Sequence, residues 1–453
     1  MPDQRDAAGL GLERRGSIVT GGHAITAAAL ANCLGTDSRT VFERAYAGAE
    51  VFSPASAFYA FPFPTMLGVM PLTHAPGTAA EIENRSRSVQ ASPAFLAAAS
   101  RSTERGNRKI PSRRGDDLEA IPTRLASVTA ASVRQIRSAV HAAAQRWGAR
   151  RIAYVFASST GGLEETERSL APDPHMPLAM GYRYADHGID ATSAAVARSL
   201  GIEGVYMAVS TACSSSFKAL ASAIRLIDHG LADAAVVGSA DSLCRTTIFG
   251  FHSLGLTAPT ATQPFSRDRS GITLGEGSAY VLIERDAPDT RRSALARVAG
   301  VGAASDAFHH TSPHPEGIGG QLCMREALDG AGMSPDDIDY ISAHGTGTKL
   351  NDAAEAVAVN RVFARGVPLT ATKSLTGHTL GSAGLTALVL AVESLRRQHI
   401  PATLRSAPLD DSLGVEIVDR LTPARIDHVL INAFGFGGSN TSVVVSQPDA
   451  GRS

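Results

Sequence analysis

Short apolar runs alternate with helical runs through the second two thirds of the chain, and this pattern limits the folds open to it. The strand-like run RIAYVFAS (151–158) follows an amphipathic helical run (121–148) that ends at a glycine. Later strand-like runs, VYMAVS, DYISAH and PLTATK, each lead through a short loop into a helical run. Apolar strands that alternate with helices predict a parallel sheet covered by helices, which is the α/β class.

The length and composition fit one large unit made of two halves. The chain has 453 residues, of which 44% are hydrophobic and 19% are charged, as in ordered globular proteins. We expect a polar N-terminal arm (1–16), a first half (17–289) and a second half (290–448). The run SIVTGGHAITAAALANCL (17–34) predicts a strand followed by a helix. Segment 50–115 is rich in proline and aromatic residues and then in basic ones, which predicts a divergent surface insertion.

Two stretches of the chain resemble each other. Tyr154–Gly162 (YVFASSTGG) and Tyr340–Thr348 (YISAHGTGT) align without gaps, and each ends an apolar strand in a loop of small residues. This likeness indicates either two similar βα halves or two unrelated strand-to-helix turns, and both interpretations are open at this point.

The charge and the cysteine pattern exclude several classes of protein. The net charge of −1 provides no overall attraction to nucleic acid or to an anionic membrane. The four cysteines are widely separated and show no zinc-like spacing, which suits a reducing cytosol. There is no apolar run of about 20 residues, the length needed to span a bilayer, and the charged N-terminus lacks the apolar core of a signal peptide. We therefore expect a cytoplasmic protein without membrane insertion.

Cys213 is the strongest candidate for a reactive residue. The run VSTACSSSFKALASAIRLIDHG places it among small residues where a strand turns into a helix. A sulfur at a helix N-terminus lies near unpaired backbone N–H groups and the positive end of the helix dipole, and both favour the nucleophilic thiolate. The alternative is a buried structural cysteine. The sharp strand-to-helix turn favours the nucleophile.

Two histidines, His344 and His378, follow predicted parallel strands and are flanked by glycine and threonine. Ligand sites of open α/β sheets gather at such strand ends. Neutral imidazoles there can donate hydrogen bonds to a developing enolate, or accept a proton. Lys373 and Glu355 could form a buried pair that tunes the histidines. Glu355 also fits a capping box in which Asp352 is the helix N-cap.

The glycine-rich turn NAFGFGGSN (432–440) follows another apolar strand. Its backbone N–H groups can form an oxyanion hole, and Phe434 and Phe436 supply apolar walls. The tract SDAFHHTSPHPEG (305–317) holds three histidines without cysteine or carboxylate ligands at metal-site spacing. We expect this tract to be a solvated or pocket-lining loop, and we expect no metal.

Taken in order, TACSSS, AHGTGT, KSLTGH and NAFGFGGSN resemble the motifs of the elongating β-ketoacyl-[acyl-carrier-protein] synthases. The resemblance extends from about Ile152 to Val445. It implies a thiolase-like fold in which two pseudo-symmetric βαβαβ halves form a five-layered αβαβα core. It also implies an acyltransferase without metal or organic cofactor, assembled as a homodimer or as a heterodimer with a related subunit.

The same resemblance implies roles for individual residues. Cys213 corresponds to the nucleophile, and its backbone N–H and that of Phe436 correspond to the oxyanion hole. The residues that correspond to the other catalytic side chains are His344, His378, Lys373 and Glu355. The residues expected to contact the substrate are Thr346 and Thr348, on the phosphopantetheine arm, and Phe434 and Phe436, beside the acyl chain.

The implied reaction is a decarboxylative Claisen condensation in fatty acid or polyketide/polyene biosynthesis. Cys213 accepts an acyl chain from acyl carrier protein, and malonyl-ACP extends it to 3-oxoacyl-ACP with release of CO2. The alternative is a catalytically idle, chain-length-factor-like partner subunit of a heterodimeric ketosynthase, which needs no thiol. The basic cluster of Arg108, Lys109, Arg113 and Arg114 either docks the acidic carrier protein or is a solvated polar loop.

Overall fold

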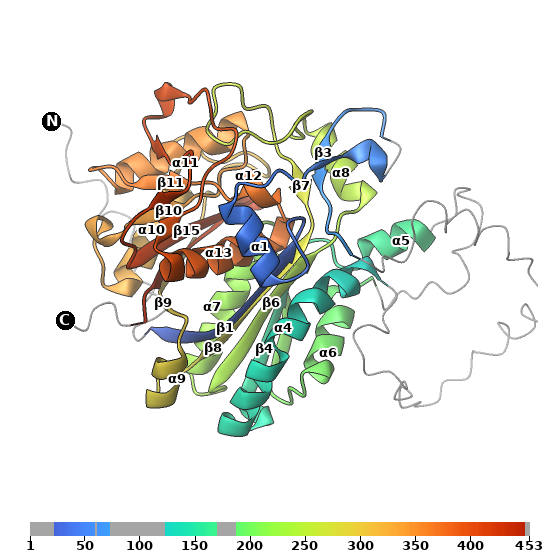
Figure 1. Cartoon of the computed structure of the whole chain (residues 1–453), viewed down its shortest axis with the longest axis vertical. Coiled ribbons are helices and arrows are strands. Elements are labelled where there is room, and N and C mark those ends of the chain that lie inside the picture. Colours follow the sequence, from blue (N-terminus) through green and yellow to red (C-terminus); the bar gives the residue numbers. More distant parts are fainter. Residues whose placement is uncertain (1–21, 59–60, 73–122, 170–186, 449–453) are drawn as a thin grey trace, which may run out of the picture.

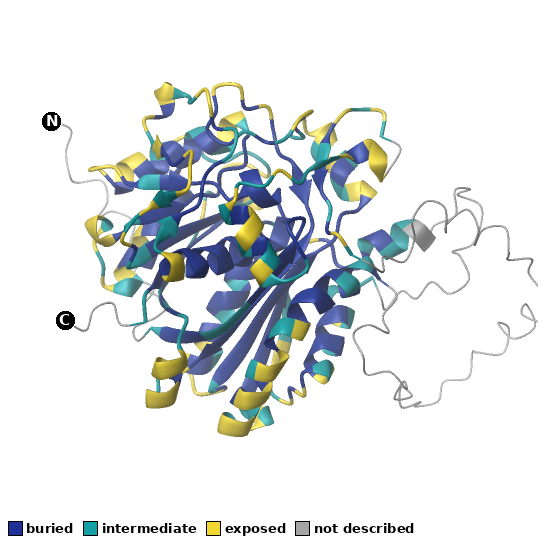
Figure 2. Cartoon of the chain, in the orientation of Figure 1, coloured by how far each residue is buried: buried dark blue, intermediate teal, exposed yellow. Residues whose placement is uncertain are grey.

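The structure is a computed structural model that describes residues 22–58, 61–72, 123–169 and 187–448. These residues form a sheet of 11 strands covered by helices (Figure 1). The strands are buried along most of their length, and the exposed residues gather on the outer faces of the helices and in loops (Figure 2). The α/β class predicted from the sequence is therefore confirmed. The predicted arm, most of the predicted insertion and the basic cluster Arg108–Arg114 lie outside the described residues.

Five strands of the first half lie in the order β1-β8-β6-β4-β5. The three strands β4, β5 and β6 run parallel, and β8 is antiparallel to both β1 and β6. All six residues of β4 (IAYVFA) are buried, as expected for a parallel strand covered on both faces. The bounds of these strands are β1 (His23–Asn32), β4 (Ile152–Ala157), β5 (Tyr206–Val209), β6 (Ala234–Asp241) and β8 (Gly277–Glu284).

The second half repeats this topology with strands β9-β16-β15-β10-β11. The strands β10, β11 and β15 are parallel, and β16 is antiparallel to both β9 and β15. The two similar stretches in the sequence thus supply equivalent strands, β4 and β10, which favours the interpretation as two similar halves. The bounds are β9 (Ala296–Ser305), β10 (Tyr340–Ser342), β11 (Pro368–Thr370), β15 (His428–Gly435) and β16 (Ser439–Ser446), with β13 (Glu416–Ile417) beside β11 at the edge.

The sheet is mixed rather than purely parallel, which the strand–helix alternation did not predict. Only three residues separate β15 from β16, so this connection is a hairpin and its strands must be antiparallel. Strands β1 and β9 pair antiparallel through His23–Ile25 and join the two halves into one sheet.

Helices form three layers around the two halves of the sheet. Helices α4 (Arg124–Trp147) and α6 (Ile189–Ser199) pack on the outer face of the first half. Helices α10 (Ile318–Ala331) and α11 (Lys349–Val362) contribute to the core on the outer face of the second half. Helices α7 and α13 share one hydrophobic core with strands of both halves, and they therefore lie between them. The bounds of this middle pair are α7 (Ser215–Asp228) and α13 (Ala383–Arg397).

Shorter elements complete the described part of the chain. The helices are α1 (Ser38–Tyr46), α5 (Leu163–Ser169), α8 (Arg245–Ser253), α9 (Pro288–Ser293) and α12 (Lys373–Thr376). The short strands are β2 (Ser53–Pro54), β3 (Met66–Gly68), β7 (Leu274–Gly275), β12 (His399–Ile400) and β14 (Thr422–Pro423).

The expected helix within residues 17–34 is wrong, because the alanine-rich run belongs to β1. Alanine is the best helix former in isolation. In this chain Ala24 to Asn32 pair with β8, and the start of the strand also pairs with β9. Strand pairing on both sides therefore overrides the local helix propensity.

Candidate active site

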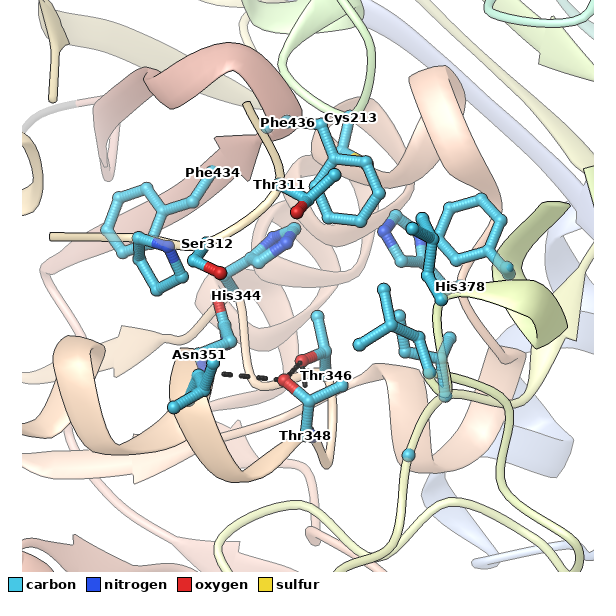
Figure 3. A pocket seen from close by; sticks show the side chains of 18 of the residues that line it. Cys213, Thr311, Ser312, His344, Thr346, Thr348, Asn351, His378, Phe434 and Phe436 are labelled. Carbon is cyan, nitrogen blue, oxygen red and sulfur yellow. Dashed lines mark hydrogen bonds between the residues drawn. The ribbon is translucent and has the colours of Figure 1, made fainter. Parts of the chain in front are cut away.

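A cavity of about 450 Å³ lies between the two halves and brings together the residues predicted to react. Cys213 comes from the first half, and His344 and His378 come from the second. In Figure 3, Cys213 and Phe436 lie at one end and the two imidazoles lie side by side next to them. All three candidate reactive side chains are buried.

The backbone around Cys213 turns sharply from strand to helix. β5 ends at Val209, and α7 begins with Ser214 as its N-cap. The residue before the thiol, Ala212, has a φ of 51°, in the left-handed region that costs energy for a side chain with a Cβ atom. This turn places the thiol at the wall of the cavity and next to the N-terminus of α7, as the sequence predicted.

The protonation of Cys213 differs from the expectation. Burial raises the pKa of the thiol to about 11, although the Lys373 ammonium and the backbone N–H groups of Phe436 and Cys213 oppose this rise. The carboxylate of Asp241 adds to the rise. Desolvation therefore outweighs the nearby positive groups and disfavours the resting thiolate that the sequence predicted.

The hydrogen bonds of the two histidines indicate their tautomers. His378 Nδ1 accepts from the backbone N–H of Leu380 at 3.1 Å. His344 Nδ1 lies 3.2 Å from Lys373 Nζ, an obligate donor when charged. With Nδ1 as acceptor in both rings, a neutral imidazole carries its proton on Nε2. The ring centroids lie 5.4 Å apart, with the planes at 86°.

Both imidazoles are neutral at physiological pH. Burial and the Lys373 ammonium hold the pKa of His378 well below its ordinary value. The same two causes, together with His378, lower the pKa of His344. The cavity therefore presents two neutral N–H donors, which can stabilise a negative oxygen without adding charge to the resting site.

Lys373 and Glu355 both hold His344 but do not pair directly in the described structure. Lys373 Nζ donates to the backbone carbonyl of His344. The carboxylate of Glu355 accepts from the backbone N–H groups of His344 at 2.7 Å and Gly345 at 2.8 Å, and from the amide of Asn432 at 3.0 Å. Burial lowers the pKa of Lys373 to about 8, against the opposing effect of Glu355.

The predicted capping box at α11 is wrong. The N-cap is Thr348, whose hydroxyl accepts from the N–H of Asn351 at 3.3 Å. Asp352 lies one turn further on and is fully buried, and its carboxylate accepts from the N–H groups of Thr346 and Gly347, both at 3.1 Å. These two loop amides do not belong to a strand, and this carboxylate satisfies them.

The predicted substrate-contacting residues all line the cavity. The hydroxyls of Thr346 and Thr348 lie 3.0 Å apart, at the end opposite Phe436 (Figure 3). The ring of Phe434 lies 5.8 Å from that of His344.

Phe436 lines both this cavity and a second one of about 490 Å³, and Cys213 also lines both. The ring of Phe436 stacks on that of Phe251 at 5.5 Å between centroids. Phe251 lies on α8 and was not among the predicted site residues, because no sequence pattern distinguishes it from a core residue.

Asp241, a buried carboxylate at the end of β6, also belongs to the site and was not among the predicted residues. It accepts from the N–H groups of Ser159 at 2.7 Å, Thr160 at 2.8 Å and Gly381 at 2.7 Å, and from the hydroxyl of Ser158 at 2.8 Å. It thus ties the loop after β4 to the turn that follows His378. An acidic residue that ends a strand of small and apolar residues, AAVVGSAD, is a signal that the sequence did contain.

The histidine-rich tract lies partly beside the cavity. Its residues Thr311, Ser312 and Pro313 line the cavity wall, whereas His309 and His310 stack on each other at 4.1 Å. Within the described ranges, no group of three or more His, Cys, Asp or Glu side chains is placed to hold a metal ion. Nor does any described helix combine the length and apolarity needed to cross a membrane.

Comparisons with known proteins identify this arrangement of fold and site. The model of the N-terminal domain of beta-ketoacyl synthases matches residues 123–288, and that of the C-terminal domain matches residues 295–406. The structure resembles a chain of the ketosynthase–chain length factor complex from Xenorhabdus doucetiae with a TM-score of 0.77 and 32% identity, covering 94% of this chain and 98% of that one. The class of protein is therefore that of the thiolase-like ketosynthases.

Two sequence relatives agree with this class. The chain is 34% identical over 261 residues to 3-oxoacyl-[acyl-carrier-protein] synthase 2 from Vibrio cholerae, covering 54% of this chain and 63% of that one. It is 33% identical over 313 residues to a putative polyketide beta-ketoacyl synthase from Streptomyces cyaneus, covering 66% of this chain and 72% of that one. The match to the Vibrio enzyme thus spans less than two thirds of its length. This chain belongs to the beta-ketoacyl synthase family, of the fatty acid or type II polyketide kind.

Proposed function

We propose that this chain is an active β-ketoacyl-ACP synthase that binds an acyl group on Cys213 and extends it with malonyl-ACP. One observation carries the proposal: a buried thiol from residues 17–289 and two neutral imidazoles from residues 290–448 line one cavity. A thiol accepts acyl groups from thioesters, and a pair of N–H donors stabilises an enolate. The acyl-transfer step and the condensation step therefore each have side chains of the required chemistry.

In the first step, the acyl group moves from the sulfur of the carrier arm to the sulfur of Cys213. The sulfur attacks the acyl carbonyl, the bond to the arm breaks, and the proton of Cys213 passes to the departing arm sulfur. The backbone N–H groups of Cys213 and Phe436, which lie beside the sulfur, are suited to bind the oxyanion formed on the way.

In the second step, malonyl-ACP loses CO2 and its C2 atom becomes the nucleophile. The electron pair of the broken bond moves into an enolate, whose oxygen accepts hydrogen bonds from the Nε2–H groups of His344 and His378. C2 then forms a bond to the acyl carbonyl on Cys213, and the Cys213 sulfur leaves as a thiolate. The thiolate then takes up a proton from water, which its raised pKa favours.

Lys373 and Glu355 position His344 in this scheme rather than touching the substrate. Lys373 donates to the carbonyl of His344 and approaches its Nδ1, while Glu355 binds its backbone N–H. The rotation of the ring and its tautomer are therefore both restrained. In this scheme Thr346 and Thr348 bind the arm, and their position in the cavity wall on the side away from Phe436 supports that role.

The alternative, an idle subunit that only shapes the acyl channel of a partner, needs no thiol. The presence of Cys213 and two imidazoles in one cavity supports the active enzyme instead. Relatives in the solved structures include a ketosynthase in complex with its chain length factor, so assembly with a related subunit is compatible with either function.

The test uses the purified full chain with acyl-ACP and malonyl-ACP, alone and with any co-purifying subunit. We expect CO2 release and 3-oxoacyl-ACP, with an acyl group on Cys213 before malonyl-ACP is added. A Cys213→Ala chain that forms product at the wild-type rate, or a wild-type chain that is never acylated while its partner is, would support the idle subunit.

A further inference from the structure

Besides Cys213 and the two histidines, the side chains with acid–base groups that line the 450 Å³ cavity are Asp306 and Lys349. Asp306 is already engaged, because its carboxylate accepts from the N–H of Gly319 and the side-chain amide of Asn440, both at 3.0 Å. Lys349, by contrast, has no acceptor or ion-pair partner in the described part of the chain. The cavity therefore has one uncompensated cation.

Lys349 marks the open end of the cavity. It is exposed, as the first residue of α11, and it follows Thr348 directly. The neighbouring lining residues Leu350 and Leu254 are 62% and 49% exposed, whereas Cys213 is only 6% exposed. The cavity thus extends from a buried thiol to a solvent-exposed cation, and two exposed leucine side chains also line it.

We propose that Lys349 binds the phosphate at the outer end of the phosphopantetheine arm. This inference rests on the proposed function, which requires an arm with its thioester at Cys213. Such an arm carries its thioester at one end and its phosphate at the other, with an apolar dimethyl group next to the phosphate. The buried thiol of Cys213 and the exposed ammonium of Lys349, directly after Thr348, line the same cavity and suit these two ends. A lysine ammonium binds phosphate as a compact point charge.

The position of Lys349 also argues against the malonyl carboxylate as its ligand. The malonyl group must reach the imidazoles of His344 and His378, which are buried, and Lys349 is exposed. The phosphate of an arm attached to the carrier protein and that of a free acyl-phosphopantetheine have the same chemistry. The experiment distinguishes them by using both as acyl donors.

The experiment measures the rate of Cys213 acylation from three donors with the same acyl chain: acyl-ACP, acyl-phosphopantetheine and acyl-pantetheine. The last two differ only in the phosphate. The variants are Lys349→Ala and Lys349→Glu, and Arg420→Ala serves as a control, because Arg420 is exposed and does not line the cavity.

We expect Lys349→Ala to slow acylation from both phosphorylated donors about two- to fivefold, the range of an exposed ion pair, and to leave acyl-pantetheine unchanged. Lys349→Glu should slow the phosphorylated donors further, and Arg420→Ala should slow none. Equal slowing of all three donors, or slowing of acyl-ACP alone, overturns the phosphate assignment; the latter would mean that Lys349 contacts the carrier protein surface. If no donor acylates the wild-type chain, the proposed function fails and this inference with it.

Discussion

The two halves have the same strand order, yet they hold their reactive loops in different ways. In the first half, the loop after β4 is bound by one carboxylate, Asp241, which comes from the neighbouring strand β6. In the second half, the equivalent loop after β10 is bound by two carboxylates, Asp352 and Glu355, both from α11. The repeated topology thus fixes where loops lie, and the buried acids determine how each loop is held.

The side chains that these strand ends carry also differ. In the first half, β5 leads to Cys213. In the second half, the equivalent strand β11 leads to Lys373 and His378. Ser158 follows β4 in the first half at the position that His344 occupies after β10 in the second half. One half therefore presents a nucleophile and the other presents proton-bearing imidazoles, and the reaction needs both.

The largest effect is expected from Cys213→Ala, which removes the contribution of the first half. Acylation by acyl-ACP should fall at least about 10³-fold, because no other described thiol lines the cavity. Mass spectrometry of the intact protein measures the attached acyl group. Cys323→Ala is the matched control: this thiol is buried in α10 and hydrogen-bonded to Ser442, and its loss should leave acylation intact.

The second-largest effect is expected from His378→Ala, and it tests whether the two halves of the protein act in different steps. His378→Ala should lower the rate of condensation by about 10²- to 10³-fold, since one of two enolate donors is lost, while acylation of Cys213 stays within about threefold of wild type. Product formation and acyl-enzyme formation are followed in the same samples. If both rates fall together, His378 acts on the first half as well, and the proposed division between halves is wrong.

The pH dependence of Cys213 alkylation tests how the second half acts on the thiol of the first. With the pKa of Cys213 raised to about 11, the thiol of the enzyme without added acyl donor should react with iodoacetamide about 100-fold more slowly at pH 7 than an ordinary thiol of pKa about 9. The rate should rise continuously toward pH 10. A plateau reached below pH 8 would contradict the raised pKa.

Two substitutions should move this profile in opposite directions. Lys373→Met removes a cation that lowers the thiol pKa, so the profile should shift to higher pH. Asp241→Asn removes a negative charge that raises it, so the profile should shift to lower pH. A change in structure alone would not produce shifts of opposite sign.

The smallest effects are expected from the carboxylates that hold the loops. Glu355→Gln should lower condensation about tenfold and reduce the free energy of unfolding by about 1–3 kcal/mol, because an amide cannot accept at all the positions that a carboxylate does. Acylation should change less. Chemical denaturation and the two rate assays measure these quantities, and Asp241→Asn provides the matched change in the first half, where acylation should be affected more.

Much of the second two thirds of the molecule could be predicted from the sequence. The run IAYVFA is β4, and the run of small and apolar residues after Cys213 is α7, because in both cases local patterning and burial agree. The prediction of a helix within residues 17–34 is wrong, because the strand β1 depends on pairing with β8 and β9. Pairing between distant segments is not visible in a local pattern.

The candidate site could be predicted in its residues but less well in its electrostatics. Cys213, His344 and His378 follow strand ends and were found by that position. The raised pKa of Cys213 depends on how completely the fold removes water, and the roles of Asp241 and Asp352 depend on which loop amides face them. Neither quantity is encoded in spacing along the chain.

The most direct test of the division between the halves uses a chain with both His344→Ala and His378→Ala. The protein is incubated with acyl-ACP and malonyl-ACP, digested, and the acyl group is located by peptide mass spectrometry. We predict one stable acyl group on the peptide that contains Cys213 and no 3-oxoacyl-ACP, whereas the wild-type chain forms product. An acyl group on any other residue, or product formation by the double variant at the wild-type rate, would contradict this account.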